Sequence, residues 1–138
     1  PPDFVPNLLR VRLDIAPSYT RLAVERAAAA VTARLAAVHN LPDTPQAFAV
    51  FDWSLQRCLA VSSGNPIYAL ILNGFGGFYE SLAVPYFTLD AARDTSRAFY
   101  TALLDAAQRN DADAVETITR AVMQESISLW LRTHPAGD

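Results

Sequence analysis

The sequence predicts an all-α fold, an antiparallel bundle of six to seven helices that forms a single domain over residues 1–138. Apolar residues recur at helical spacing along nearly the whole chain, and no stretch shows the alternation that is typical of a strand. Alanine-rich runs such as RAAAAVTARLAAV are strong helix formers. With 51% hydrophobic and 18% charged residues, the chain is apolar enough to bury a core.

The N-terminal half contains the first predicted helices. Residues 3–15 form an amphipathic segment, and we expect Pro17 to kink the helix or to restart it before residues 18–26. The segment HNLPDTP is a predicted loop, in which Thr44 is a suitable N-cap and Pro45 takes the first helical position. The helix that follows should run to about residue 61.

A long apolar helix is predicted next, after the SSGN segment. Asn65 caps this helix and Pro66 begins it. We expect it to lie in the middle of the bundle, because it is apolar on most sides and continues through the three glycines at 74, 76 and 77. A glycine inside a helix costs about 1 kcal/mol relative to alanine. These glycines therefore indicate a close approach, either of a neighbouring helix or of a ligand.

The C-terminal part of the chain completes the bundle. The segment VPYFTLD is expected to break the chain, and a helix follows over about residues 90–109. The short segment RND turns the chain into a last helix over residues 111–133. The acidic residues at the starts of these helices complement the helix dipole, so they do not indicate an acid–base pair.

Composition excludes several classes of function. A net charge of −3 gives the chain as a whole no electrostatic footprint for nucleic acid. A single cysteine, Cys58, excludes an internal disulfide and fits a reducing, cytoplasmic location. Two histidines and one cysteine argue against structural zinc. We find no membrane span and no signal peptide, and since the chain starts Pro-Pro without a methionine, we interpret it as a fragment.

One arginine falls on an apolar helical face. The positions of Phe4, Leu8, Val11 and Ile15 predict one buried side of the first helix, and Arg12 lies within that arc. A buried guanidinium keeps its charge, so Arg12 needs an anionic partner or several acceptors. A ligand could supply them, and an internal ion pair or a snorkelling surface arginine is the alternative.

Other polar residues border apolar stripes. Asp52, with Gln56 one turn on, lies beside a stripe formed by Phe48, Phe51, Leu55, Cys58 and Leu59. In the last helix Ser126 and Trp130 belong to the stripe of Val115, Ile118, Val122 and Leu129. Ser126 could bond back to a carbonyl and Trp130 could be core, so a role in binding is only one reading. No nucleophile, phosphate-loop or dinucleotide motif occurs, and we predict that the protein is not an enzyme.

Two segments resemble a known family. DWSLQRCLAVSSGNP is similar to the D-x-x-F-H-R-x-L-A-x-x-S-G-N-P signature of GntR-family effector domains, which follow a winged-helix DNA-binding domain in bacterial transcriptional regulators. YTALLDAAQRNDADAVETITRAV resembles the H-x-x-I-L-x-A-I-x-x-G-D-x-x-A-A segment of the same family. With NPIYALILNG and QESISLW, the likeness is closest to the FadR-like, fatty-acid-responsive branch and covers essentially the whole chain.

The resemblance implies that a metal site has been lost. Most of the wider family binds a divalent metal through an aspartate and three histidines. Asp52 retains the aspartate, whereas Gln56, Tyr100 and Val122 stand where the histidines would be. This set of side chains is unsuited to a transition metal. We therefore expect no metal and no other cofactor.

The resemblance implies instead a tunnel for a long-chain fatty acyl group attached to coenzyme A. Positions that match ligand contacts in this branch are Leu8, Arg12, Tyr79, Tyr86, Tyr100, Ser126 and Trp130. The branch has a tyrosine where this chain has Val122 and a glycine where it has Met123, so the tunnel could differ in length. Pro135 replaces a lysine, which would weaken contact with the coenzyme phosphates.

The expected output is regulation of transcription. Inserting an acyl chain between helices would move the first helix, which the resemblance joins to an N-terminal winged-helix domain absent from this chain. The full-length protein would be a homodimer that contacts DNA only through that domain, without contacting a membrane. Two alternatives remain open, namely a regulator that senses a free fatty acid or another apolar carboxylate, and a lipid carrier with no regulatory output.

Overall fold

The chain folds into a bundle of helices, confirming the predicted all-α class. The computed structural model describes residues 4–77 and 79–135, and within these ranges it contains six α-helices, one 3₁₀ helix and no strand. The elements are α1 (Phe4–Leu35), η1 (Ala36–Asn40), α2 (Pro45–Ser62), α3 (Pro66–Asn73), α4 (Tyr79–Phe87), α5 (Asp90–Gln108) and α6 (Ala112–Thr133).

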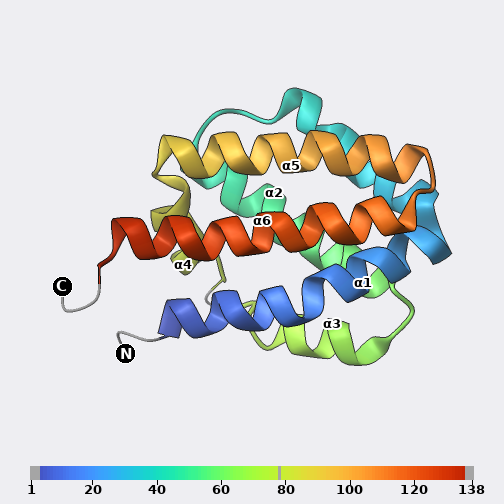
Figure 1. Ribbon diagram of the computed structural model, residues 1–138, viewed down its shortest axis with the longest axis horizontal. Helices are drawn as coiled ribbons and strands as arrows, with labels where there is room; N and C mark the ends of the chain where they lie inside the picture. The colour runs from blue at the N-terminus through green and yellow to red at the C-terminus, as the bar shows by residue number, and fades with distance from the viewer. Residues whose placement is uncertain (1–3, 78, 136–138) are drawn as a thin grey trace.

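The long helices determine the shape of the bundle. The first half of α1, α6 and α5 lie side by side with α6 between the other two, and α2 packs behind them (Figure 1). The short helix α3 packs on α2, and α4 packs on both α2 and α5. The start of α1 and the end of α6 lie at the same end of the molecule (Figure 1). Residues from both of these helices can therefore contribute to one site.

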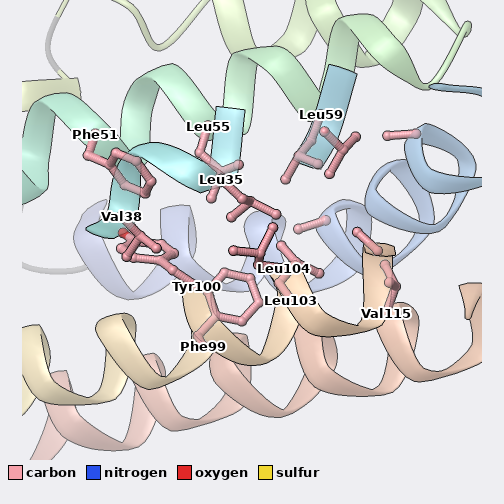
Figure 2. Packing of buried hydrophobic residues seen from close by; sticks show 14 of the residues in the cluster. Leu35, Val38, Phe51, Leu55, Leu59, Phe99, Tyr100, Leu103, Leu104 and Val115 are labelled. Atoms are coloured by element: carbon pink, nitrogen blue, oxygen red, sulfur yellow. The ribbon is translucent and has the colours of Figure 1, made fainter. Parts of the chain in front are cut away.

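A continuous hydrophobic core joins these helices. Figure 2 shows side chains of α2, α5 and the end of α1 meeting between the helices, among them Leu55, Leu59, Tyr100 and Leu103. All four are completely buried. Burying a side chain of this size stabilises the fold by about 1.5–3 kcal/mol relative to leaving it exposed. The predicted stripe of α2 is thus confirmed, although Cys58 at its border is only half-buried.

The helix starts predicted from capping residues are confirmed. The Thr44 hydroxyl accepts a hydrogen bond from the Ala47 amide at 3.1 Å, and the Asn65 side chain accepts one from the Ile67 amide at 3.0 Å. Each cap supplies a partner to one of the amides that the first turn leaves unpaired, and a proline follows it at the first helical position.

Helix α1 differs from the prediction in two respects. It continues through Pro17, and its departure from helical geometry comes at Ala27 (φ −149°, ψ 48°) instead. Pro17 is itself buried, as are Ala16 and Tyr19 beside it. We attribute the continuity to this packing, which outweighs the one backbone hydrogen bond that proline removes. The predicted buried face is also shifted, because Phe4 and Val11 are 39% and 38% exposed while Leu9 is buried.

The predicted long apolar helix is wrong. The chain forms two short helices, α3 and α4, with Gly74 at the end of α3 and residues 76 and 77 in the turn that follows. The glycines therefore do not lie inside a helix. Helix α3 is peripheral and not central, since Ile67 and Leu70 are 56% and 67% exposed.

The end of α4 also differs from the prediction. Pro85 lies inside the helix, which ends only at Phe87, so the break predicted over residues 84–90 begins too early. A proline near the end of a helix removes only one backbone hydrogen bond, and the buried Phe87 holds the last turn in the core. None of the helices in the described ranges combines the length and apolarity required to cross a bilayer.

Candidate functional site

A buried carboxylate is the centre of the most polar region in the core. Asp52 on α2 accepts hydrogen bonds from the hydroxyls of Tyr100, at 2.8 Å, and of Tyr79. The guanidinium of Arg12 lies 3.4 Å from the same carboxylate. Four helices, α1, α2, α4 and α5, therefore meet in one cluster of hydrogen bonds, which we call the Asp52 cluster (Arg12, Asp52, Tyr79, Tyr100). Its ion pair is the internal partner that the sequence required for Arg12.

Aromatic packing fixes the side chains of this cluster. Tyr100 is completely buried and its ring meets that of Phe51 edge to face, with the centroids 4.7 Å apart. The Arg12 guanidinium lies over the Tyr79 ring, 5.8 Å from its centroid, a favourable arrangement of cation and ring. The ring of Trp53 packs against that of Tyr79, with the centroids 4.8 Å apart. The polar atoms are consequently held in place by apolar surfaces.

A second polar layer lies one turn along α2. The hydroxyl of Tyr19 donates to the side-chain oxygen of Gln56, and both residues are buried. The amide nitrogen of Gln56 and the hydroxyl of Thr20 are buried without a hydrogen-bond partner among the described residues. An unpaired buried polar group costs about 1–3 kcal/mol. Gln56 is thus part of the polar core that surrounds Asp52.

Burial keeps the phenols of the site protonated. It raises the pKa of Tyr100 well above the ordinary value, and the negative charge of Asp52 raises it further. Burial likewise raises the pKa of Tyr79. The positive charge of Arg12 partly offsets this rise, and the negative charge of Asp52 adds to it. Burial alone would lower the pKa of Arg12, but Tyr79 and Asp52 outweigh this effect and the net change is upward. At neutral pH the phenols of Tyr79 and Tyr100 are therefore protonated and can donate, and Arg12 keeps its positive charge.

An apolar cavity lies beside this cluster, between α1, α4 and α6, and we call it the apolar cavity. Its volume is about 40 Å³. The side chains around it come mostly from the first turns of α1, from α4 and from the end of α6, and they are Val5, Leu8, Leu9, Arg12, Tyr79, Leu82, Ala83, Tyr86, Phe87 and Trp130. Among these described residues Arg12 is the only charged one, so an apolar chamber ends at a single charged group.

A smaller cavity also borders Arg12, and we call it the polar cavity. Its volume is about 10 Å³. It shares three wall residues with the apolar cavity, and its full lining is Arg12, Asp52, Tyr86, Phe87, Ser96, Phe99, Val122, Met123 and Ser126. Arg12, Tyr86 and Phe87 therefore border both cavities.

Ser126 makes the bond back to a carbonyl that was one alternative expected from the sequence. Its hydroxyl donates to the Val122 carbonyl at 2.9 Å, one turn back along α6. The same hydroxyl accepts a hydrogen bond from Tyr86 at 3.2 Å and lines the polar cavity. A serine that bonds back to its own helix can still present its oxygen to a neighbouring helix.

Trp130 lines the apolar cavity. Its ring stacks on that of His134, with the centroids 3.6 Å apart and an angle of 10° between the rings. Trp130 lies near the end of α6 and His134 follows the helix as its C-cap, at the end of the bundle where α1 begins (Figure 1). The tryptophan is thus a boundary of the cavity and not part of the central core.

The structure brings the predicted site residues together in one region. Leu8, Arg12, Tyr79, Tyr86 and Trp130 line the apolar cavity. Arg12, Asp52, Tyr86, Val122, Met123 and Ser126 line the polar cavity. Gln56 and Tyr100 line neither, and they lie in the buried polar core behind Asp52.

The glycines are not part of this region. No glycine of the described residues lines either cavity. Gly76 instead approaches the side chain of Trp53, since a Cβ added at this position would lie 3.3 Å from the indole ring. The sequence left open whether the glycines admit a neighbouring helix or a ligand. At Gly76 the close neighbour is Trp53 of helix α2.

Sequence reasoning missed several residues of this region, among them Tyr19, Ser96 and Phe87. Tyr19 follows Arg12 by seven residues and therefore lies on the same face of α1, which is a signal that periodicity could have given. Ser96 precedes Tyr100 by one turn of α5 in the same way. Phe87 lines both cavities, but it falls in the segment that was predicted to be a break.

The donor set does not suit a metal ion. Among the described residues, no three side chains of histidine, cysteine, aspartate and glutamate gather as metal ligands would. The carboxylate of Asp52 is occupied by Arg12 and by two phenols. A fixed guanidinium at this distance supplies the positive charge that a cation would otherwise bring.

Comparison with known proteins identifies one matching family and several similar proteins. The family described as the FadR C-terminal domain matches residues 1–136 of this chain. Similar curated proteins include three that are each named "Fatty acid metabolism regulator protein". Those of Shewanella halifaxensis (strain HAW-EB4) and Edwardsiella ictaluri (strain 93-146) are each 37% identical over 129 residues, which is 94% of this chain and 54% of the relative. That of Shewanella amazonensis is 35% identical over 135 residues, or 98% of this chain and 56% of the relative. The chain thus spans about half the length of these relatives.

Proposed function

This chain belongs to the FadR C-terminal domain family, and we propose that it is the ligand-sensing domain of a fatty-acid-responsive transcriptional regulator that binds a long-chain fatty acyl-CoA. The names of its relatives support a role in the regulation of fatty acid metabolism. DNA would be contacted by a separate winged-helix domain in a homodimer, since this chain has a net charge of −3.

One observation carries the proposal: an apolar cavity in which the charged wall residue, Arg12, is held in place by Asp52. Apolar walls suit an alkyl chain, because each buried methylene contributes about 0.8 kcal/mol and a dozen of them about 10 kcal/mol. Arg12 and the hydroxyls around it suit the oxygen-bearing end of such a chain. Hydrogen bonds from a charged donor are among the stronger ones in proteins.

Binding requires the helices to part. The two cavities, of about 40 and 10 Å³, hold a few atoms, whereas a single water molecule already needs about 10–15 Å³ by this measure. A long chain must therefore displace α1, α4 or α6. A ligand that binds the open arrangement more tightly shifts the equilibrium toward it. In the proposed regulator, displacement of α1 is what alters the geometry of the DNA-binding domain.

Calorimetric titration of the chain with hexadecanoyl-CoA, hexadecanoic acid and coenzyme A tests this proposal. We expect saturable binding of one hexadecanoyl-CoA per chain, and affinity for coenzyme A at least about 100-fold lower because the apolar contribution is missing. Absence of binding by hexadecanoyl-CoA, or equal affinity for coenzyme A, would overturn the proposal. A lipid carrier would bind in the same way, but a full-length protein would then bind DNA identically with and without the acyl-CoA.

Two variants locate the binding. Arg12→Gln should weaken hexadecanoyl-CoA binding about tenfold, since one charge-assisted hydrogen bond contributes about 1.5–3 kcal/mol. Ala83→Phe fills the apolar cavity without touching the ion pair and should block binding. Arg10→Gln is the matched control, because Arg10 is exposed on the same helix. Circular dichroism verifies that each variant is folded, and unchanged affinity in both test variants would contradict the assigned site.

A further inference from the structure

We infer that the polar cavity is a seat for one uncharged acceptor oxygen of the ligand, and that Ser96 is the residue that donates a hydrogen bond to it. The inference rests on the proposed function and deepens it. It assigns the donor for the thioester carbonyl that the proposed acyl-CoA would bring, and it accounts for a preference over a carboxylate.

Ser96 differs from the buried hydroxyl residues of α6. It is 7% exposed and its side chain lines the polar cavity. Thr119 and Ser126, also buried, each donate to the carbonyl four residues earlier, at 2.8 and 2.9 Å. The Ser96 hydroxyl makes no hydrogen bond to the described residues of the chain. A hydroxyl that is free to rotate thus lies at the wall of a buried cavity.

The other hydroxyl protons around the cavity are already used. Tyr86 donates to Ser126, and Ser126 donates to the Val122 carbonyl. Tyr79 and Tyr100 donate to Asp52. The side-chain donors that remain for a ligand, within the described lining of the cavity, are therefore the Ser96 hydroxyl and the nitrogens of Arg12 that do not face Asp52. A ligand that enters the polar cavity must therefore supply a hydrogen-bond acceptor for these donors.

Charge balance argues against a carboxylate. Arg12 and Asp52 are the only charged residues in the described lining of the polar cavity, and they form an ion pair at 3.4 Å. The cavity is thus neutral as a whole. A carboxylate entering it would place a second negative charge beside Asp52 in a poorly solvated region, where like charges cannot both remain ionised without a large cost. A carbonyl oxygen brings no charge and avoids this repulsion.

The polar cavity is small while the helices are closed. Its volume of about 10 Å³ is close to the minimum that holds one water molecule. The alkyl chain of the ligand would extend toward the apolar cavity, which shares Arg12, Tyr86 and Phe87 with the polar cavity.

Calorimetric titration of Ser96→Ala tests the inference. We expect its affinity for hexadecanoyl-CoA to fall about 2- to 10-fold, which corresponds to one net hydrogen bond, and its affinity for hexadecanoic acid to stay unchanged. The matched control is Ser128→Ala, since Ser128 is exposed on α6 and lines neither cavity. If wild-type protein binds the thioester and Ser96→Ala binds it equally well, the inference is wrong while the proposed function stands. If the wild type fails to bind the thioester, the proposed function itself is wrong.

A spectroscopic readout separates a direct contact from a structural effect of the substitution. With the thioester carbonyl labelled with ¹³C, its infrared stretching band should shift to lower frequency on binding to the wild type, and this shift should shrink in Ser96→Ala. An identical band in both proteins would show that Ser96 does not touch the carbonyl.

Asp52→Asn tests whether the negative charge of Asp52 disfavours a carboxylate. In Asp52→Asn the cavity gains a net positive charge, so we expect preference to move toward hexadecanoic acid by about tenfold relative to the thioester, in keeping with the effect of removing a nearby like charge. The amide keeps an acceptor for one phenol and nearly the same shape. An unchanged ratio of the two affinities would contradict the exclusion of carboxylates by Asp52.

Discussion

At the scale of single residues, the pairing of Arg12 with Asp52 organises the site. The sequence indicated that an arginine within an apolar arc needs an anionic partner or several acceptors, and it placed an aspartate at the border of another stripe. Periodicity could not show that these two residues are partners of each other. The distance between two helices depends on the packing of the whole core, which is not encoded in either helix alone. The two residues meet at 3.4 Å because α1 and α2 pack against each other.

The phenols of the Asp52 cluster predict a dependence of stability on alkaline pH. The pKa values of Tyr79 and Tyr100 are raised in the folded protein, by burial first and by Asp52 in addition. Above about pH 10 the unfolded chain loses phenol protons that the folded chain keeps. The stabilisation from these phenols should therefore be fully retained below about pH 10 and fall as the pH rises further, by up to about 1.4 kcal/mol per pH unit for each such tyrosine.

Urea unfolding between about pH 8 and pH 11.5 measures this fall, and ultraviolet absorbance of the phenolate reports when it forms. Tyr100→Phe removes one of the groups, so its stability should decline less steeply over the same range. Phenolate formation in the folded protein near pH 10 for every tyrosine, or an equal decline in Tyr100→Phe, would contradict the description of the cluster.

Ser96 could not be identified as a site residue from the sequence. Serine is common in helices and usually bonds back to its own backbone, so nothing in its neighbourhood distinguishes it. Its position one turn before Tyr100 placed it on the buried face, but only the structure shows a cavity beside it. Arg12, by contrast, could be identified early because a charge on an apolar face is uncommon.

At the scale of helices, the glycines of the chain have different roles. Gly64 follows α2 with a φ of +78°, a conformation that side chains rarely adopt. A Cβ at this position would also lie 2.3 Å from the Arg26 side chain, which would have to move. At Gly77, by contrast, a Cβ would meet no atom of the described residues within 4 Å, and the backbone does not have a positive φ.

Gly64→Ala should therefore lower the free energy of unfolding by about 1–2 kcal/mol, the usual cost of a left-handed conformation for an L-residue. Gly77→Ala is the matched control and should be neutral or slightly stabilising, because it reduces the freedom of the unfolded chain. Urea denaturation of both variants measures the difference. Equal stability of the two variants would show that neither glycine is required by its backbone conformation.

The α3–α4 segment shows why element boundaries were hard to predict. Its run of apolar residues was consistent with one long buried helix, and the capping residue at its start was identified correctly. What hydropathy could not show is that two of these apolar residues, Ile67 and Leu70, face outward. Pro85 in turn suggested a break, although the helix ends two residues later at Phe87. Hydropathy describes a residue, whereas burial depends on which neighbours the fold supplies.

At the scale of the whole molecule, the fold places the start of α1 and the end of α6 at one end of the bundle (Figure 1). The fold class was predictable, because helical periodicity and family signatures extend over the whole chain. The presence of an apolar and a polar cavity was not predictable, since it depends on which side chains the packed helices bring together. In the proposed regulator, the same wall of α1 that closes the cavity transmits the signal.

The central claim is that an acyl chain enters between α1, α4 and α6. It is tested most directly by intermolecular nuclear Overhauser effects between hexadecanoyl-CoA and methyl-labelled protein. The proposal predicts contacts from the alkyl chain to the methyls of Leu9, Leu82 and Ala83 in the apolar cavity. Contacts confined to Val50 and Val61, which line open surface grooves along α2, would instead place the chain on the outside of the bundle and contradict the claim.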